Sequence, residues 1–326
     1  MRSRMANCGF RIGLKMAIGA CIAAAPVYAY VTAKTLSNVG VAVQSKWRPG
    51  AFPIRWQINP VKGANITGTV EQAEVFRTSF FSWQSVGTAT VTFIEGAPTP
   101  TNIVSSYDNI NLITTNITPQ QYGSSALAFT TTFTIDQGGV VDQFDRPVDF
   151  PGQIMEADIM FNPSTQFSTN ATTPATLFDL QSVAIHEIGH LLGLDHTNLV
   201  SSVMFPTLIA GVNYARTLTT DDIAGISTIY PSAAFNAKGT LSGTVRTTSN
   251  TAVFGAMVTA VNASGQPVAS ALTDPQGRYT IAGLDPGSYT VYAEALDQPM
   301  RPQDIGTLAT IYSGLTVFTN FTTRFR

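Results

Sequence analysis

The chain has 326 residues, of which 44% are hydrophobic and only 12% are charged. Its 18 Lys and Arg residues are balanced by 20 Asp and Glu residues, which gives a net charge of −2 at pH 7. Because nucleic-acid binding depends on clustered Lys and Arg, this balance excludes nucleic acid as the expected partner. The length allows about two domains with hydrophobic cores of their own.

Residues 1–29 have the pattern of a secretory signal peptide. Basic residues come first, an apolar stretch follows over 16–25, and Val27-Tyr28-Ala29 supplies the small residues that a signal peptidase accepts. The apolar stretch is too short to cross about 30 Å of hydrocarbon, which argues against the alternative of an uncleaved anchor. We therefore expect cleavage after Ala29 and a secreted or extracellular protein, bacterial in type, with no stable membrane span.

Both cysteines, Cys8 and Cys21, fall inside this predicted signal peptide. The mature protein is therefore expected to have neither a disulfide nor a thiolate metal ligand. Packing of the core has to hold such an exported chain together.

Residues 30–48 show no clear periodicity and are interpreted as a lead-in segment. Apolar patterns typical of strands occur at 52–58, 90–94, 111–114, 126–133 and 154–161. Apolar residues at helical spacing predict helices at 70–86 (with Thr69 as the N-cap), 178–192 and 218–230.

The composition changes after Pro231. Val, Ala and Tyr alternate with Thr and Ser over 238–296, and this stretch is broken by turns rich in Gly and Pro, which indicates a β-sandwich. We place the domain boundary between 231 and 238. The tail over 316–326 alternates like a further strand, which either completes the sandwich or belongs to a longer chain.

All three histidines of the chain, His186, His190 and His196, lie in the single segment HEIGHLLGLDH. His186 and His190 are four residues apart in a predicted helix, so both imidazoles project from one face and can bind the same Zn²⁺ at about 2.0–2.1 Å. Gly193 lets the chain leave the helix with a positive φ, so that His196 can approach the ion from another direction.

Three protein ligands leave a fourth position open for water, which is typical of a catalytic zinc site. Zinc lowers the pKa of such a water towards about 7, and Glu187 is close enough to take its proton. The alternative is an amphipathic helix that happens to carry two histidines. The full spacing, with the glycine and the third histidine, favours the metal site.

HEIGHLLGLDH resembles the zinc-binding motif of the metzincin peptidases, and its HExGHxLGLxH form resembles the matrixin branch, the relatives of matrix metalloproteinases. Ser202-Val203-Met204-Phe205-Pro206 resembles the Met-turn of that family, 218–226 its final helix, and 80–93 its first helix and the strand after it. The resemblance covers about residues 45–232. It implies an α+β fold, with a metzincin catalytic domain over 49–232 made of a twisted mixed β-sheet and three helices.

The resemblance implies a zinc-dependent endopeptidase acting on proteins or peptides, which we expect to be a monomer with one catalytic zinc. By carry-over, Glu187 is the general base, Met204 is the methionine beneath the ion, and the zinc ligands are His186, His190 and His196. Substrate would lie extended along residues 126–130. The side chain after the scissile bond would enter a pocket lined by Ser182, His186 and the loop 206–217.

This chain departs from the family at two points. No histidine remains for the structural zinc of the family, and the mature chain lacks the cysteine that keeps relatives latent. Four carboxylates in one loop containing glycine are candidate calcium ligands, because Ca²⁺ prefers several oxygen ligands on flexible backbone: Asp136, Asp142, Asp145 and Asp149. A solvated acidic loop is the alternative.

Residues 239–295 resemble carboxypeptidase regulatory-like domains, which implies a small all-β sandwich over 238–326. Its role as an adhesive surface, a substrate-presenting module or an inert spacer stays open. A second hypothesis for the whole chain is therefore a catalytically silent metzincin scaffold, acting as an extracellular binding or adhesion protein through the sandwich. The presence of Glu187 argues against it. A zinc hydrolase that does not cleave peptides fits the pattern over 45–232 less well.

Overall fold

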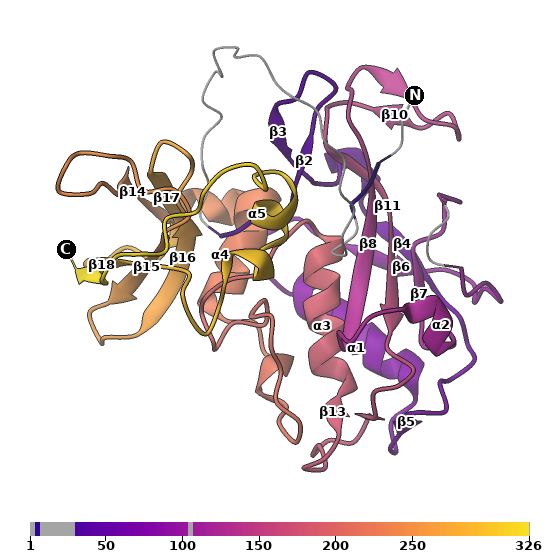
Figure 1. Ribbon diagram of the computed structural model, residues 1–326. Helices are drawn as coiled ribbons and strands as arrows, with labels where there is room; N and C mark the ends of the chain where they lie inside the picture. The colour runs from indigo at the N-terminus through magenta and orange to yellow at the C-terminus, as the bar shows by residue number, and fades with distance from the viewer. Residues whose placement is uncertain (1–3, 7–29, 104–106, 326) are drawn as a thin grey trace.

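The computed structural model describes residues 4–6, 30–103 and 107–325. Within these ranges an N-terminal module is built on a six-stranded sheet, and a C-terminal module is built from a two-stranded and a four-stranded sheet (Figure 1). The predicted α+β architecture, a mixed sheet with helices followed by an all-β module, is confirmed.

The large sheet has the strand order β1-β8-β11-β7-β4-β6. Strands β6, β4, β7 and β11 are parallel to one another, whereas β8 is antiparallel to both β11 and β1. The central strand β11 is buried along its whole length, and six of its nine residues are apolar. The bounds are β1 (Arg4–Ala6), β4 (Ile54–Ile58), β6 (Phe93–Glu95), β7 (Leu112–Thr114), β8 (Ala128–Ile135) and β11 (Gln153–Phe161).

Short strands connect the parts of this module. They form a three-stranded sheet, a hairpin in the loop between β8 and β11, and a second hairpin that precedes β4 in the chain. Their bounds are β5 (Ile66–Thr67), β12 (Phe167–Ser168), β13 (Phe178–Asp179), β9 (Val140–Val141), β10 (Pro147–Val148), β2 (Lys34–Leu36) and β3 (Ala42–Gln44).

Helices α1 (Gln72–Gln84) and α3 (Leu180–Leu191) pack against each other, and α3 also packs against β8 and β11. Trp83 joins the two helices: its side chain is fully buried, and its Nε1 donates to the main-chain oxygen of Ile185 at 2.9 Å. The remaining helices of this module are α2 (Pro119–Tyr122), α4 (Thr220–Ile229) and the 3₁₀ turns η1 (Pro49–Ala51) and η2 (Tyr214–Arg216).

The start of α1 differs from the prediction. The N-cap is Glu71 and not Thr69. Thr69 is held elsewhere, since its main-chain N–H donates to Oδ1 of Asn170 at 3.0 Å. Helix α4 begins with a reciprocal capping box between Thr219 and Asp222.

Residues 30–48 are more structured than a loose lead-in segment. Beyond the β2–β3 hairpin, Tyr30 and Val31 are buried, and Thr32 forms a β-bridge with Leu194. Backbone pairing with a distant loop leaves no periodicity in a short sequence, which is why the pattern of residues 30–48 did not indicate this order.

The predicted signal peptide lies mostly outside the described residues. Within it, Arg4–Ala6 form β1, which pairs with Thr132–Thr134 on the outer edge of β8. These three residues are therefore joined to the sheet, whereas a signal peptide is expected to be separate from the fold. Among the described residues, no helix has both the length and the apolar character that spanning a bilayer requires.

The C-terminal module has two sheets. One pairs β14 (Gly239–Thr244) with β17 (Arg278–Leu284), and the other has the order β16-β15-β18-β19, with bounds Pro267–Leu272, Met257–Asn262, Tyr289–Glu294 and Arg324–Phe325. The turn η3 (Ala233–Ala237) occupies the predicted domain boundary, and η4 (Pro302–Asp304) and α5 (Gly306–Thr310) follow the sandwich strands.

The predicted strand over 316–326 is wrong for most of its length, because only Arg324–Phe325 is a strand in the described part of the tail. The preceding residues pack against a loop instead. The Phe318 main-chain N–H donates to the oxygen of Phe254 at 2.9 Å, and Val317 lies against Gly255.

The two modules share one apolar cluster. Tyr30 and Ala224 of α4 are buried together with Val258, Ala260 and Ile281 of the C-terminal strands. The Ser270 main-chain N–H also donates to Oδ1 of Asp221 at 2.8 Å. The C-terminal module is therefore packed onto α4 and is not a separate body on a linker, as Figure 1 also shows.

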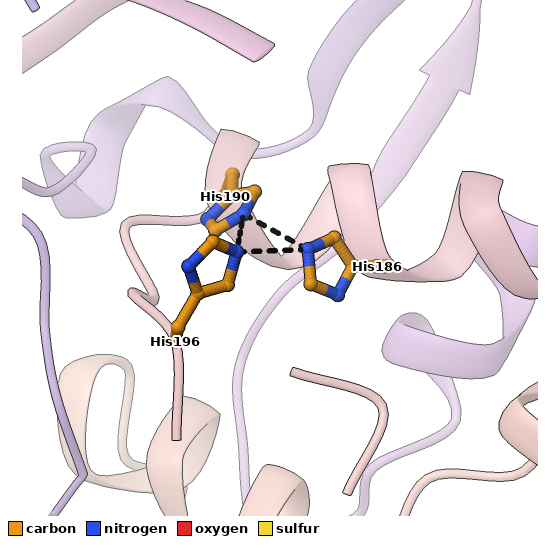
Figure 2. Close-up of side chains that lie close together, drawn as sticks. All are labelled: His186, His190 and His196. Carbon is orange, nitrogen blue, oxygen red and sulfur yellow. Dashed lines mark hydrogen bonds between the residues drawn. The ribbon is translucent and has the colours of Figure 1, made fainter. Parts of the chain in front are cut away.

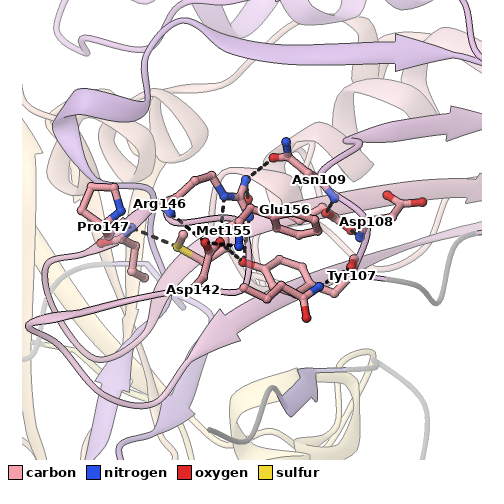
Figure 3. Close-up of polar contacts among 11 residues, drawn as sticks. Tyr107, Asp108, Asn109, Asp142, Arg146, Pro147, Met155 and Glu156 are labelled. Carbon is pink, nitrogen blue, oxygen red and sulfur yellow. Dashed lines mark hydrogen bonds and ion pairs between the residues drawn. The ribbon is translucent and has the colours of Figure 1, made fainter.

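Strand β11 carries two carboxylates in an otherwise apolar interior, Glu156 and Asp158. Glu156 accepts the main-chain N–H groups of Asp108 and Asn109 (Figure 3), and Oδ1 of Asp158 accepts that of Leu112 at 2.9 Å. Oδ2 of Asp158 has no hydrogen-bond partner among the described residues. Burial raises the pKa of Glu156 to about 7 and that of Asp158 to about 8.

These raised pKa values predict a protein that loses stability as pH rises. Between about pH 4 and pH 8 the folded chain binds more protons at Asp158 than the unfolded chain, so the free energy of unfolding falls with increasing pH. Asp158→Asn keeps the oxygen facing Leu112 and removes the ionisation. We expect its loss of stability between pH 5 and pH 8 to be smaller than that of wild type by at least about 1 kcal/mol, measured by urea denaturation.

The control is Asp145→Asn, at an exposed position with a positive φ that asparagine tolerates. It should follow the pH profile of the wild type. An Asp158→Asn profile as steep as that of the wild type would contradict the prediction.

Candidate metal centre

Helix α3 presents the first two histidines because its sequence starts and packs it firmly. Asp179 caps the helix, with Oδ2 accepting the Ser182 main-chain N–H at 2.8 Å, and Arg216 forms an ion pair with the same carboxylate. The buried face of the helix fixes its rotation, so His186 and His190 both face the cleft between the helix and the following loops.

The three histidine side chains converge on one point. The Nε2 atoms of His186 and His190 are 3.1 Å apart, and each lies 3.2 Å from Nε2 of His196 (Figure 2). A tetrahedral zinc with bonds of 2.0–2.1 Å separates its ligand nitrogens by about 3.3 Å. Among the described residues this is the one cluster of three histidine, cysteine or acidic side chains with metal-ligand spacing.

Each Nδ1 atom faces a main-chain carbonyl oxygen. The acceptors are Val203 for His186 at 2.7 Å, Leu194 for His190 at 2.9 Å and Asp304 for His196 at 2.5 Å. With the Nδ1 proton donated to a carbonyl, each Nε2 carries a lone pair directed at the other two.

Three converging lone pairs have no proton to share, so a cation is the partner that the geometry fits. Burial lowers the pKa of His186, and lowers that of His190 to about 3, with the neighbouring imidazoles adding to both shifts. Neutral imidazoles are the form that binds metal. The residues present therefore fit zinc.

Glu187 lies beside the cluster and is buried, with 4% of its surface exposed. The Thr130 hydroxyl on β8 is 2.7 Å from its Oε2 and 2.9 Å from its main-chain oxygen. Burial raises the pKa of Glu187 to about 8, against the contact with Thr130, which lowers it. A carboxylate whose pKa lies near neutrality can both accept and return a proton.

The loop after His196 places Met204 beneath α3, where it is buried against Gly189, between the two helical histidines. Asp222 of α4 holds this loop: its carboxylate accepts the main-chain N–H groups of Val203 and Met204 at 3.1 and 3.2 Å. The Val203 oxygen is in turn the acceptor for Nδ1 of His186. Asp222 therefore orients His186 indirectly, by holding the main chain of Val203.

Two glycines shape the motif. Gly193 has a φ of +92°, as predicted, and a Cβ there would lie 2.3 Å from the main-chain oxygen of Ser45. Gly189 had no predicted role. A Cβ at Gly189 would lie 2.3 Å from Sδ of Met204 and 3.0 Å from the Trp83 ring.

We therefore expect Gly189→Ala to destabilise the protein. Overpacking costs about 1–3 kcal/mol, which outweighs the gain of about 1 kcal/mol from replacing a helical glycine. Thermal unfolding of the variant should show a lowered Tm. Gly87→Ala is the matched control, since a Cβ at Gly87 meets no atom within 4 Å. Equal Tm values for the two variants would refute this account of Gly189.

The histidines open into a cleft with a volume of about 590 Å³. Its lining includes residues 125–130, which run into the start of β8, and Ser182, Phe205–Leu208 and Tyr214–Ala215. The structure thus brings the predicted substrate edge (126–130), the predicted pocket residues and the zinc ligands into a single cavity.

The four candidate calcium ligands do not form a common site among the described residues. The Asp142 carboxylate is used within the protein: it accepts from the main-chain and Nε groups of Arg146, both at 2.8 Å, and from the Tyr107 hydroxyl (Figure 3). Asp149 pairs with Arg48 at 3.4 Å. This arrangement gives a calcium site no support.

Sequence reasoning missed the residues that orient the site. Thr130, Asp222 and the carbonyl of Asp304 lie far along the chain from the histidines they serve, and no spacing rule connects them. Of these groups, only Asp222 has a sequence signal, because a carboxylate three residues after Thr219 is typical of a helix N-terminus. The hydrogen bonds that Asp222 accepts from Val203 and Met204 have no such signal.

Comparison with known proteins supports the resemblance found in the sequence. The matrixin family matches residues 46–231, which is more than half of the chain, and the carboxypeptidase regulatory-like domain matches 240–305. Metalloendoproteinase 1 of Glycine max is 37% identical over 94 residues, covering 28% of this chain and 29% of that protein.

Two further relatives match over shorter stretches. Metalloendoproteinase 2-MMP of Arabidopsis thaliana is 52% identical over 52 residues, 16% of this chain and 14% of that protein. Matrilysin of Rattus norvegicus is 52% identical over 48 residues, 15% and 18% respectively. The matched part is less than a third of the length of each of these relatives. Taken with the histidine geometry, the match over 46–231 shows that this chain belongs to the matrixin family.

Proposed function

We propose that this protein is a secreted zinc-dependent endopeptidase that hydrolyses internal peptide bonds with Glu187 as general base. The observation that carries the proposal is the convergence of three Nε2 atoms beside a buried glutamate, in a cleft walled by a sheet edge. The names of the metalloendoproteinase relatives support the same activity. The catalytic domain would span 49–232 and the sandwich module 238–326.

A zinc ion held by His186, His190 and His196 would polarise the scissile carbonyl and acidify the attacking water. Glu187 takes the proton of that water and returns it to the leaving amine. Thr130 holds the carboxylate of Glu187 on the cleft side of α3. No side chain has to form a covalent bond with the substrate.

The substrate would bind as an extended strand along β8. The antiparallel pairing of β1 with Thr132–Thr134 supports this, since it shows that the outer edge of β8 accepts a further strand. Signal-peptide cleavage after Ala29 would remove β1 and leave that edge free. A side chain of the substrate would then enter the part of the cleft that is lined by Ser182 and Leu208.

The test is to incubate the full zinc-loaded chain with denatured casein and a peptide library, and to identify the products by mass spectrometry. Cleavage at internal bonds that stops on chelation supports the proposal. A folded protein with one bound zinc that cleaves nothing would refute it. That outcome would favour the second hypothesis, a binding or adhesion protein on a silent metzincin scaffold.

A further inference from the structure

The third zinc ligand is oriented by a different part of the chain from the first two. The carbonyls that accept from His186 and His190 belong to Val203 and Leu194, in the same module as the ligands. His196 instead faces the main-chain oxygen of Asp304, which lies 108 residues further along, in the C-terminal module.

A carboxylate next to His196 makes a second connection to the same segment. Asp195 is buried, with 6% of its surface exposed, and it accepts the main-chain N–H groups of Gly306 at 2.9 Å and Thr307 at 2.7 Å. These are the first two N–H groups of α5, so Asp195 caps that short helix from another module. Oδ1 of Asp195 also accepts the main-chain N–H of His196 at 2.8 Å.

The same segment reaches the cleft itself. Gln303, Thr307 and Thr310 line the cavity that contains the three histidines, beside Ala33 and Lys34. The Thr307 hydroxyl also donates to the main-chain oxygen of Thr32 at 3.0 Å. In Figure 1, α5 is drawn near the boundary between the two modules, where Gly306 and Thr307 make their hydrogen bonds to Asp195 and Thr32.

We propose that residues 301–310, here called the C-terminal segment, are a positioning element of the zinc site and one wall of the substrate cleft. The Asp304 carbonyl selects the tautomer of His196 with its Nε2 lone pair free, and Asp195 fixes the segment that carries this carbonyl. The C-terminal module is then part of the active site and not a spacer. The second half of the proposal, the cleft wall, rests on the proposed peptidase function.

The physical reason is that the partner of a metal-bound histidine sets both its tautomer and its ring orientation. Loss of such a partner typically weakens metal binding about 10-fold to 100-fold. Because the acceptor for His196 belongs to the C-terminal module, the affinity for zinc depends on how that module packs against the N-terminal module. Asp195 is a positioning residue in this sense, because it acts through Asp304 and His196.

The first test compares full-length Asp195→Asn with wild type. The amide keeps the volume of the side chain, but its nitrogen cannot accept a hydrogen bond. We expect zinc affinity, measured by competition with a chelator, to fall at least about tenfold. The visible absorption of the Co²⁺-loaded protein should also change, since it reports the geometry of the ligands. Asp285→Asn, at a side chain 73% exposed in the C-terminal module, should match wild type in both measurements.

A second variant keeps the test decisive if Asp195→Asn fails to fold. Gly306→Pro removes one of the N–H groups donated to Asp195, and proline suits the first position of a helix. Like Asp195→Asn, this variant should have a lower affinity for zinc than wild type. A folded Gly306→Pro protein with the zinc affinity and Co²⁺ spectrum of wild type would overturn the positioning role.

The cleft wall is tested by Gln303→Ala on a peptide library. We expect zinc affinity to stay within about twofold of wild type, while the ranking of kcat/KM among peptides changes at one side of the scissile bond. An unchanged ranking would overturn this half of the proposal. If wild type binds zinc tightly and cleaves nothing, the peptidase function and the cleft wall fail, while the zinc affinities still decide the positioning role.

Discussion

Replacing Glu187 with glutamine is expected to lower kcat/KM for peptide cleavage by about 10²–10⁴ while zinc remains bound. The amide has nearly the same shape as the carboxylate and keeps an oxygen to face the Thr130 hydroxyl, but it cannot take a proton from water. None of the three imidazoles hydrogen-bonds to the Glu187 side chain, so the ligand geometry should persist. The measurement is initial rates on a fluorogenic peptide, with zinc content determined on the same samples.

Glu74→Gln is the control for the change in charge. Glu74 lies on α1, where its side chain is exposed and pairs with Arg77. This variant should cleave at the rate of wild type, because a surface ion pair contributes little. If Glu187→Gln retained more than a tenth of the wild-type rate with zinc bound, a base other than Glu187 would have to act.

Removing zinc with a chelator is expected to abolish cleavage and to lower the thermal stability of the protein. Without the cation, three Nε2 lone pairs face one another at 3.1–3.2 Å, which is unfavourable in a half-buried site. Zinc at 100 times its Kd stabilises the folded state by about 2.7 kcal/mol. For a chain of 326 residues, with an unfolding entropy of about 2.1 cal/mol/K per residue, that corresponds to a Tm difference of about 4 °C.

Adding back zinc should restore both the activity and the Tm, whereas adding calcium alone should restore neither. The calcium arm has a structural reason, since the Asp142 carboxylate is already occupied by Arg146 and Tyr107. A protein whose Tm is the same with and without zinc would show that the three histidines do not form a folded metal site.

Because the C-terminal module contacts the zinc site, we expect a chain that lacks this module to have an altered site. A chain cut at the domain boundary would lose the acceptor of His196 and the partners of Asp195, along with the cluster around Tyr30. Weak zinc binding in such a truncated chain would therefore reflect a missing part of the site, and not a property of the matrixin fold.

The features of this protein that depend on local geometry were predictable from its amino-acid sequence. The helical period places His186 and His190 on one face, and the positive φ at Gly193 follows from the need to turn the chain towards His196. Five strands of the mixed sheet and the helices α1, α3 and α4 were predictable because their apolar residues follow a strand or a helix pattern, whereas β1, α2 and α5 were not predicted.

The groups that hold the site from distant parts of the chain were not predictable, because they depend on how the elements pack together. Thr130 reaches Glu187 from β8, Asp222 ties the Met204 loop to α4, and Asp304 orients His196 from the other module. The tail was mispredicted because its alternation fits a strand, whereas a nearby loop offered it a different partner. A hydrogen bond between residues far apart in the chain depends on how modules pack, and single polar residues leave no periodic trace from which that packing could be predicted.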